Sequence, residues 1–320
     1  MINKRFINYA WLMLVVTLIV ILWGDVVQAT GSGDGCGAHW PVCNGEVLPA
    51  FEGKETMIEF VHRLTSGMVF LMAAGLLVWA WRAYPKGSGV RQGANFTMLF
   101  MITESLVGAG LVLFRLVGEN SSMARAFVAP IHLLNTLLLI GAVILTLYFA
   151  YGGKRFSWKG QGRAAWLLSG GLLAIVLLST TGAITSLGDA IFPVANTAEA
   201  VSRSLSPSEH FLVRLRIWHP FIAIAVGTYL LIAAQLVVRQ KASSLTRNLA
   251  LAVSMVYLLQ LVIGVLNVAL SAILPTQLIH LLMADSLWML WVLLTASALA
   301  MPALAAQQNF GVARGLSGTD

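Results

Sequence analysis

The chain has 320 residues, of which 58% are hydrophobic and only 10% are charged, and its formal net charge is +7. Ordinary soluble domains carry about 25% charged residues, so the composition excludes a typical soluble globular protein and indicates a polytopic membrane protein. The basic residues are spread over loops between apolar segments. That distribution reports membrane orientation rather than nucleic-acid binding.

Eight apolar segments are long enough to cross a bilayer, which takes roughly 20 residues. The first segment follows a short basic start and has no small-residue cleavage site, so it is predicted to be a membrane span and not a signal peptide. The predicted spans are 7–24, 58–81, 95–114, 126–150, 164–184, 210–238, 247–270 and 276–303.

Lys and Arg are distributed unevenly between the two sides of this arrangement. The N-terminus, the loops after the second, fourth and sixth spans and the tail with Arg314 hold 13 of the 20 basic residues, and the opposite side holds 7. Because cytoplasmic loops carry the excess of Lys and Arg, both termini are predicted to be cytoplasmic, in a cell membrane. The long polar segments 25–57 and 185–209 then face outward.

The second half of the chain repeats features of the first. Ile-His-Leu-Leu opens the fourth span at 131–134 and the eighth at 279–282, and segment 106–111 resembles segment 261–266. Since each half has an even number of spans, both halves have the same orientation, which is a parallel duplication. The sequence therefore predicts an all-α membrane protein of two tandem four-helix bundles, 1–155 and 156–320.

Four of the six histidines share one depth, near the outer end of each even-numbered span: His62, His132, His219 and His280. A single histidine on an apolar helix is usually a packed core residue, but four in this pattern indicate a binding function. Within each half, two imidazoles from nonadjacent helices can ligate one haem iron axially. Zinc or copper is less favoured, since these ions usually take more converging ligands. The other two, His39 and His210, lie in or beside outer loops.

Glu59 precedes His62 by three residues, so both lie on one helix face. An ionisable residue in a membrane span is a functional candidate. Thr56 and Glu59 also fit a capping box, in which the Glu side chain satisfies the start of the helix. A chemical role and a structural role for Glu59 both stay open at this point.

Two further groups lie at the predicted outer face. Cys36 and Cys43 share the exported segment 25–57, where a disulfide is expected, either as a structural staple or as a redox-active pair. Arginines flank the histidine-bearing helices, and arginine binds carboxylates such as haem propionates bidentately, although snorkelling to lipid headgroups is the alternative. These arginines are Arg63, Arg125, Arg214 and Arg216.

Taken together, these segments resemble the haem A synthase family. The matching residues are Thr30-Gly31-Ser32-Gly33, Cys36 with Trp40-Pro41-Val42-Cys43-Asn44-Gly45, Glu59-Phe60-Val61-His62-Arg63, His132, Trp218-His219-Pro220 and Ile279-His280. The resemblance covers most of the chain, and the first loop and the Glu-x-x-His-Arg segment are its most specific parts. The residues between the cysteines depart from the commoner pattern of the family, which leaves His39 without an assigned role.

The resemblance implies an enzyme that oxidises the C8 methyl group of haem O to a formyl group through hydroxylated intermediates. It implies that His62 and His132 ligate the substrate haem O in the N-terminal bundle, and that His219 and His280 ligate a permanent haem b in the C-terminal bundle. Glu59 would be the catalytic carboxylate, and electrons would leave through an acceptor outside this chain.

Two other functions stay open: a quinol-linked, di-haem electron-transfer protein, and a haem transporter with histidine gates. The expected partners are the lipid bilayer, haem O synthase, assembly factors of the terminal oxidase and further copies of this chain. No nucleic-acid partner is expected.

Overall fold

A computed structural model of the chain is all-helical over the residues that it describes, 3–50, 53–241 and 243–300. Eight helices in these ranges are long and apolar enough to cross a membrane, so the predicted fold class and the number of spans are confirmed. The membrane helices are α1 (Lys4–Ala29), α2 (Lys54–Ala83), α3 (Gly89–Leu113), α4 (Met123–Ala150), α5 (Arg163–Ile191), α8 (Trp218–Gln240), α9 (Ser244–Ala269) and α10 (Leu274–Ala298), with α7 (Phe211–Leu215) leading into α8. Arg314, used to infer the orientation, lies outside the described residues, and the orientation stays a prediction.

Several membrane helices begin before their apolar stretches do, because serine side chains cap them. The hydroxyl of Ser88 accepts a hydrogen bond from the backbone N–H of Arg91 at 3.3 Å, and Ser122 and Ser243 cap α4 and α9 in the same way. Such caps satisfy N–H groups that have no partner within the helix. The predicted starts were therefore several residues too late.

The outer segment 185–209 contains more helix than predicted. α5 continues to Ile191, and a short helix, α6 (Thr197–Leu205), follows. Asn196 caps α6 by accepting from the backbone N–H of Glu199 at 3.0 Å. Arg203 forms an ion pair with Glu209 at 2.8 Å, and the hydrogen bond from this guanidinium lowers the pKa of Glu209.

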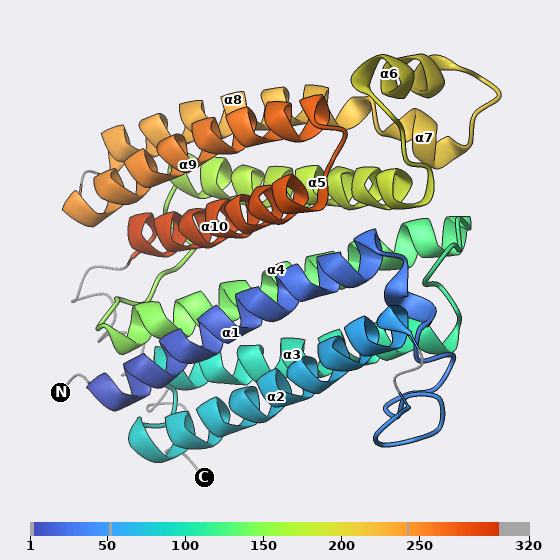
Figure 1. Cartoon of the computed structure of the whole chain (residues 1–320). Coiled ribbons are helices and arrows are strands. Elements are labelled where there is room, and N and C mark those ends of the chain that lie inside the picture. Colours follow the sequence, from blue (N-terminus) through green and yellow to red (C-terminus); the bar gives the residue numbers. More distant parts are fainter. Residues whose placement is uncertain (1–2, 51–52, 242, 301–320) are drawn as a thin grey trace, which may run out of the picture.

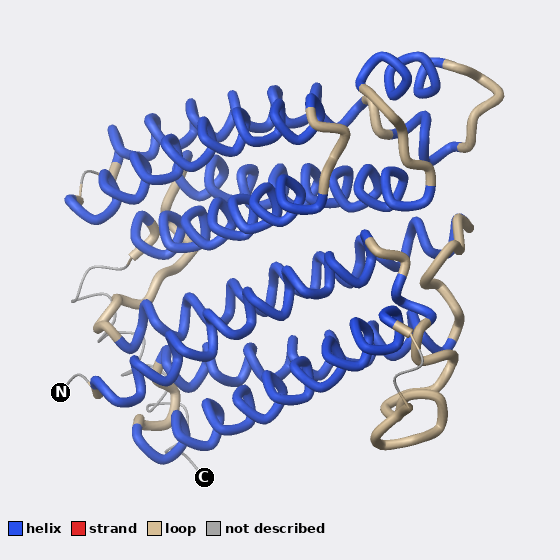
Figure 2. Tube along the Cα trace, viewed as in Figure 1, coloured by secondary structure: helices blue, strands red, loops and turns tan. Residues whose placement is uncertain are grey.

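The helices form two groups that meet along a seam (Figure 1). In the first group α2 and α4 pack on α1 and α3, and in the second group α5 and α9 pack on α8 and α10. Across the seam α1 and α4 contact α5 and α10. Figure 2 shows that the connecting loops gather at the two ends of the helices. The division into two bundles at residues 155 and 156 stays a prediction.

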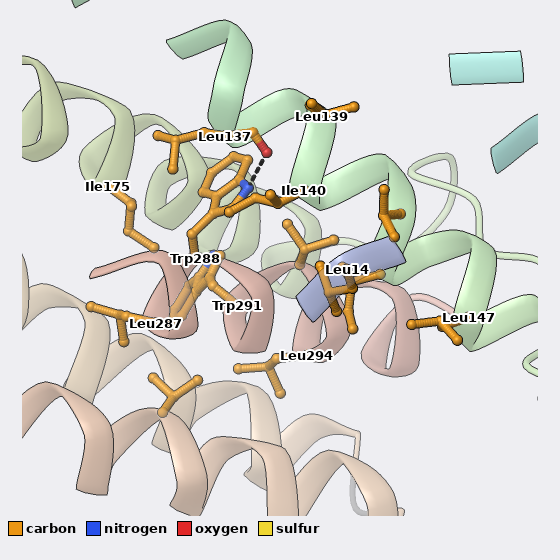
Figure 3. Close-up of a cluster of buried hydrophobic side chains, with 14 of the residues drawn as sticks. Leu14, Leu137, Leu139, Ile140, Leu147, Ile175, Leu287, Trp288, Trp291 and Leu294 are labelled. Carbon is orange, nitrogen blue, oxygen red and sulfur yellow. Dashed lines mark hydrogen bonds between the residues drawn. The ribbon is translucent and has the colours of Figure 1, made fainter. Parts of the chain in front are cut away.

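Two tryptophans of α10 pack tightly at the seam (Figure 3). The Trp288 Nε1–H donates to the Leu137 carbonyl of α4 at 2.6 Å, and the Trp291 Nε1–H donates to the Leu168 carbonyl of α5 at 3.1 Å. Trp291 is fully buried against Gly171, where a Cβ atom would lie 2.0 Å from its ring. The Trp288 bond thus joins the two groups of helices, whereas Trp291 ties α10 to α5 within the second group.

Candidate functional site

The two C-terminal histidines lie at a separation that suits two ligands of one iron atom. His219 in the first turn of α8 and His280 of α10 have ring centroids 6.4 Å apart. Two metal–nitrogen bonds of about 2 Å each, with the distance from each nitrogen to its ring centre added, come to about 6 Å. The residues present therefore fit one iron held between two imidazoles.

The tautomer of His219 also suits metal ligation. The Thr181 hydroxyl lies 2.8 Å from the Leu178 carbonyl, which can take its only hydrogen. When it does, the same hydroxyl, 3.1 Å from His219 Nδ1, accepts a hydrogen bond from Nδ1–H. The proton of the neutral ring is then on Nδ1, which leaves the Nε2 lone pair free to bind a metal.

The N-terminal histidines are also neighbours. His62 of α2 and His132 of α4 interact electrostatically, and Nδ1 of each is buried without a hydrogen-bond partner among the described residues. The described ranges contain no group of three or more His, Cys, Asp or Glu residues placed to hold a metal ion. Each pair is therefore a two-ligand site, which is the number of protein ligands that a bis-histidine haem takes.

Each of the four histidines rests against a glycine of the preceding membrane helix. A Cβ atom built on that glycine would lie 3.1 to 3.5 Å from the histidine Cε1 atom. The pairs are Gly24 with His62, Gly108 with His132, Gly182 with His219 and Gly264 with His280. The sequence analysis did not identify this contact, although Gly108 and Gly264 both lie in the repeated segments 106–111 and 261–266.

The capping-box interpretation of Glu59 is wrong. α2 begins at Lys54 after Gly53, and the Thr56 hydroxyl donates to the Gly35 carbonyl at 2.8 Å. Glu59 is 3% exposed, and its Oε2 accepts from the backbone N–H of Cys36 at 2.7 Å. Its Oε1 accepts from Arg63, one turn further along α2. Glu59 thus holds the loop that contains Cys36 onto α2 and has both carboxylate oxygens engaged.

The predicted disulfide is confirmed, and the loop that it closes is bound to the same helix. Cys36 and Cys43 are bonded, with Cα atoms 4.4 Å apart, and both are buried. Arg63 donates to the carbonyls of His39 at 2.5 Å and Val42 at 2.7 Å. His39 therefore contributes a backbone carbonyl to this contact, while its side chain is exposed.

The other arginines predicted to bind propionates differ in their surroundings. Arg125 is 4% exposed and donates to the carbonyls of Gly118 and Asn120. Arg216 is 7% exposed and lies 3.2 Å from Asp189. Arg214 is exposed. Propionate binding stays a prediction for all four, and the structure gives Arg63, Arg125 and Arg216 protein partners. His210, also placed near an outer loop, caps α7 by accepting from Leu212 N–H.

A carboxylate that the sequence analysis missed lies beside His132. Glu104 of α3 places Oε1 3.3 Å from His132 Nδ1, close enough for an ion pair, although the N–H direction is not aligned for a hydrogen bond. Asn135 and Thr136 of α4 each donate to Glu104 at 2.5 Å. The available signal was that Glu104 is the one charged residue in the predicted span 95–114.

A second missed carboxylate lies where the two groups of helices meet. Asp285 of α10 is 1% exposed, and both of its carboxylate oxygens are buried without a hydrogen-bond partner among the described residues. Asp25 of α1 acts on it electrostatically. An ionisable residue inside a membrane protein is a functional candidate, and Asp285 is likewise the one charged residue in its predicted span.

Comparison with known proteins identifies relatives along most of the chain. Residues 7–292 match the family model of the cytochrome oxidase assembly proteins, COX15-CtaA. Two proteins of Thermus thermophilus named protoheme IX farnesyltransferase are each 50% identical over 296 residues, which is 92% of this chain and 49% of theirs. A heme A synthase of Alkalihalophilus pseudofirmus is 35% identical over 48% of this chain and 49% of its own length. A heme A synthase of Exiguobacterium sibiricum is 30% identical over 57% of this chain and 59% of its own length. The chain spans about half the length of the first of these relatives.

Proposed function

The chain belongs to the cytochrome oxidase assembly protein family, and on that premise we propose that it is a haem A synthase, which oxidises the C8 methyl group of haem O to a formyl group through hydroxylated intermediates. The observation that carries the proposal is the presence of two histidine pairs, one in each group of helices, each imidazole seated against a glycine. Relatives named heme A synthase support the same reaction.

The farnesyltransferase name of the Thermus proteins belongs to chains of which this protein spans only half. Transfer of a farnesyl group from farnesyl diphosphate requires a site for the diphosphate that leaves, which proteins commonly bind through Mg²⁺ held by carboxylates. The described residues offer paired imidazoles instead. The name of the Thermus proteins connects relatives of this chain with the farnesylation of haem, which supports a farnesylated haem as the substrate.

In this proposal His62 and His132 hold the substrate haem O, and His219 and His280 hold a resident haem b. When bound, the haem iron would supply the redox chemistry that removes electrons from the methyl group. The protein contributes position. Thr181 fixes the tautomer of His219, and the four facing glycines allow the imidazoles to lie close to the neighbouring helices.

Glu59 is the proposed catalytic carboxylate. Conversion of a methyl group to a formyl group, with the oxygen taken from water, releases protons and electrons in equal numbers, so the site needs a proton acceptor. Glu59 lies three residues before His62 on α2 and is paired with Arg63. Its other oxygen accepts from Cys36 N–H, so the disulfide loop sets the orientation of this carboxylate. A general base of this kind contributes about 10²–10⁴-fold in rate.

The experiment that tests the proposal is extraction of the haem from the purified protein, followed by reverse-phase chromatography. A haem A synthase contains haem O, a hydroxylated intermediate or haem A in addition to haem b. A quinol-linked electron-transfer protein, for which the facing pair His219 and His280 is equally suited, contains haem b alone. Purified protein without stoichiometric low-spin haem would favour a transporter and contradict the proposal.

A further inference from the structure

Each histidine pair has a polar residue at a corresponding position in its half of the chain, and the type of that residue differs between the halves. Glu104 lies four residues before Gly108, and Gln260 lies four residues before Gly264. Each of these glycines faces the histidine of the next membrane helix, His132 or His280. The corresponding position therefore carries a carboxylate in the N-terminal half and a neutral amide in the C-terminal half.

Glu104 belongs to a polar cluster that holds it beside the His132 ring. Asn135 and Thr136, on the same helix as His132, each donate to it at 2.5 Å. Asn135 is fixed in turn, because its amide donates to the Phe100 carbonyl and its oxygen accepts from Thr103. With two donors holding Glu104, its Oε1 lies 3.3 Å from His132 Nδ1. The cluster places a negative charge next to the ring nitrogen.

Gln260 contacts His280 without such a charge. Its amide nitrogen lies 3.0 Å from the His280 carbonyl, to which it donates, and 3.3 Å from the ring Nε2. Its amide oxygen is buried without a hydrogen-bond partner among the described residues, and so is His280 Nδ1. Gln260 can position the helix that carries His280. Because its amide is neutral and is not a base, it places no negative charge beside the ring.

We propose that Glu104 is a positioning residue that makes His132 a stronger electron donor to iron than His280, so that the N-terminal site has the lower reduction potential. The inference rests on the proposed function, because it takes the histidine pairs to be haem ligands. A carboxylate that lies 3.3 Å from the ring nitrogen raises the basicity of a ligating imidazole through its charge, and the surroundings of an axial ligand are one lever on haem potential. A more basic ligand stabilises the ferric over the ferrous state.

The consequence is a direction for electron transfer. An electron passes from the site of His132 to the site of His280, with one iron oxidised from ferrous to ferric and the other reduced from ferric to ferrous. No bond forms or breaks in this step. Electrons removed from a substrate in the N-terminal half thus pass from the site of lower reduction potential to the C-terminal site of higher potential, which is the favourable direction.

The test is an optical redox titration of the full chain reconstituted with protohaem IX, in parent variants that keep one histidine pair each. The N-terminal site is measured in His219→Ala, with and without Glu104→Gln. The C-terminal site is measured in His62→Ala, with and without Gln260→Glu. Glu55→Gln is the control for loss of one carboxylate, since Glu55 is half-exposed at the start of α2 and pairs only loosely with Lys54.

Glu104→Gln is expected to raise the potential of the N-terminal site and to weaken its haem binding by about 10–100-fold. Gln260→Glu is expected to lower the reduction potential of the C-terminal site. If Glu104→Gln retains too little haem for a titration, the potential of Gln260→Glu tests the inference instead. If haem is bound but the reduction potential shifts no more than it does in Glu55→Gln, the inference about Glu104 is wrong. The proposed function is not affected by that result. Absence of haem from both parent variants would contradict the proposed function instead.

Discussion

Replacement of Gly182 by alanine should separate helix stability from haem binding, because the two effects have opposite signs. A Cβ atom on Gly182 would lie 3.1 Å from His219 Cε1, whereas carbon atoms prefer a separation of about 3.5–4.0 Å. The ring must therefore move by about 0.4 Å or more, away from α5. In a site where two imidazoles have centroids 6.4 Å apart, that shift is comparable with the ~0.5 Å tolerance of a functional constellation.

Alanine in place of a helical glycine otherwise stabilises a helix by up to about 1 kcal/mol. We expect Gly182→Ala to keep or raise the melting temperature of the haem-free protein while haem dissociates about tenfold faster, equivalent to about 1.4 kcal/mol. The assays are thermal unfolding in detergent and transfer of haem to an apo-globin acceptor. Gly67→Ala is the matched control, since no atom lies within 4 Å of a Cβ atom built at this position. Equal haem retention in the two variants would refute the argument that glycine is needed beside the ligand.

Other predictions address the remaining features. Glu59→Gln should fold and keep haem b but lower haem A formation by about 10²–10⁴-fold; formation within a few-fold of wild type would leave Glu59 only its role in holding the disulfide loop. His219→Ala purified without added haem should lack the low-spin haem b spectrum, and full haem b content in this preparation would disprove the C-terminal assignment. Gly171→Ala should destabilise the protein by about 1–3 kcal/mol through overpacking against Trp291, as measured by thermal unfolding. Reporter fusions in the α4–α5 loop and in α6 should lie on opposite sides of the membrane, and a shared side would contradict the topology.

The sequence was sufficient to predict the eight spans, and it singled out four histidines that the structure places as neighbours in two pairs. Apolar length and spacing determine these features locally, so no knowledge of distant contacts was needed. The sixth span was predicted as one helix, but it breaks between Leu215 and Trp218, where α7 ends and α8 begins. Mean hydropathy does not detect such a break because the long apolar run of α8 dominates the average, although Arg214, Arg216 and Pro220 lie beside the break.

The role of Glu59 could not be predicted from local spacing. Thr56 and Glu59 satisfy the capping-box pattern, but their actual partners, Gly35 and Cys36, are more than 20 residues away in the chain. Tertiary contacts therefore replaced the local hydrogen bonds. Glu104 was missed for a different reason, since the sequence analysis weighed histidines by their repetition and Glu104 has no acidic counterpart in the second half.

The pattern of contacts at the seam has a consequence for the origin of the molecule. If the predicted duplication is applied to the helices, α1 corresponds to α5 and α4 to α10, so the contact of α1 with α10 is the counterpart of the contact of α5 with α4. The contacts of α1 with α5 and of α4 with α10 are each their own counterpart. This is the self-complementary pattern of an isologous dimer with two-fold symmetry.

An ancestral four-helix protomer could therefore have formed this interface with its own copy before gene fusion joined the two. Such a fusion would have freed each copy to change alone, which a homodimer encoded by one gene cannot do. Glu104 and Gln260, or the clamped disulfide loop on one side and α6 on the other, are differences that a homodimer of identical chains could not acquire. A chain cut in the α4–α5 loop and expressed as two fragments should then reassemble, because the interface itself needs no covalent link.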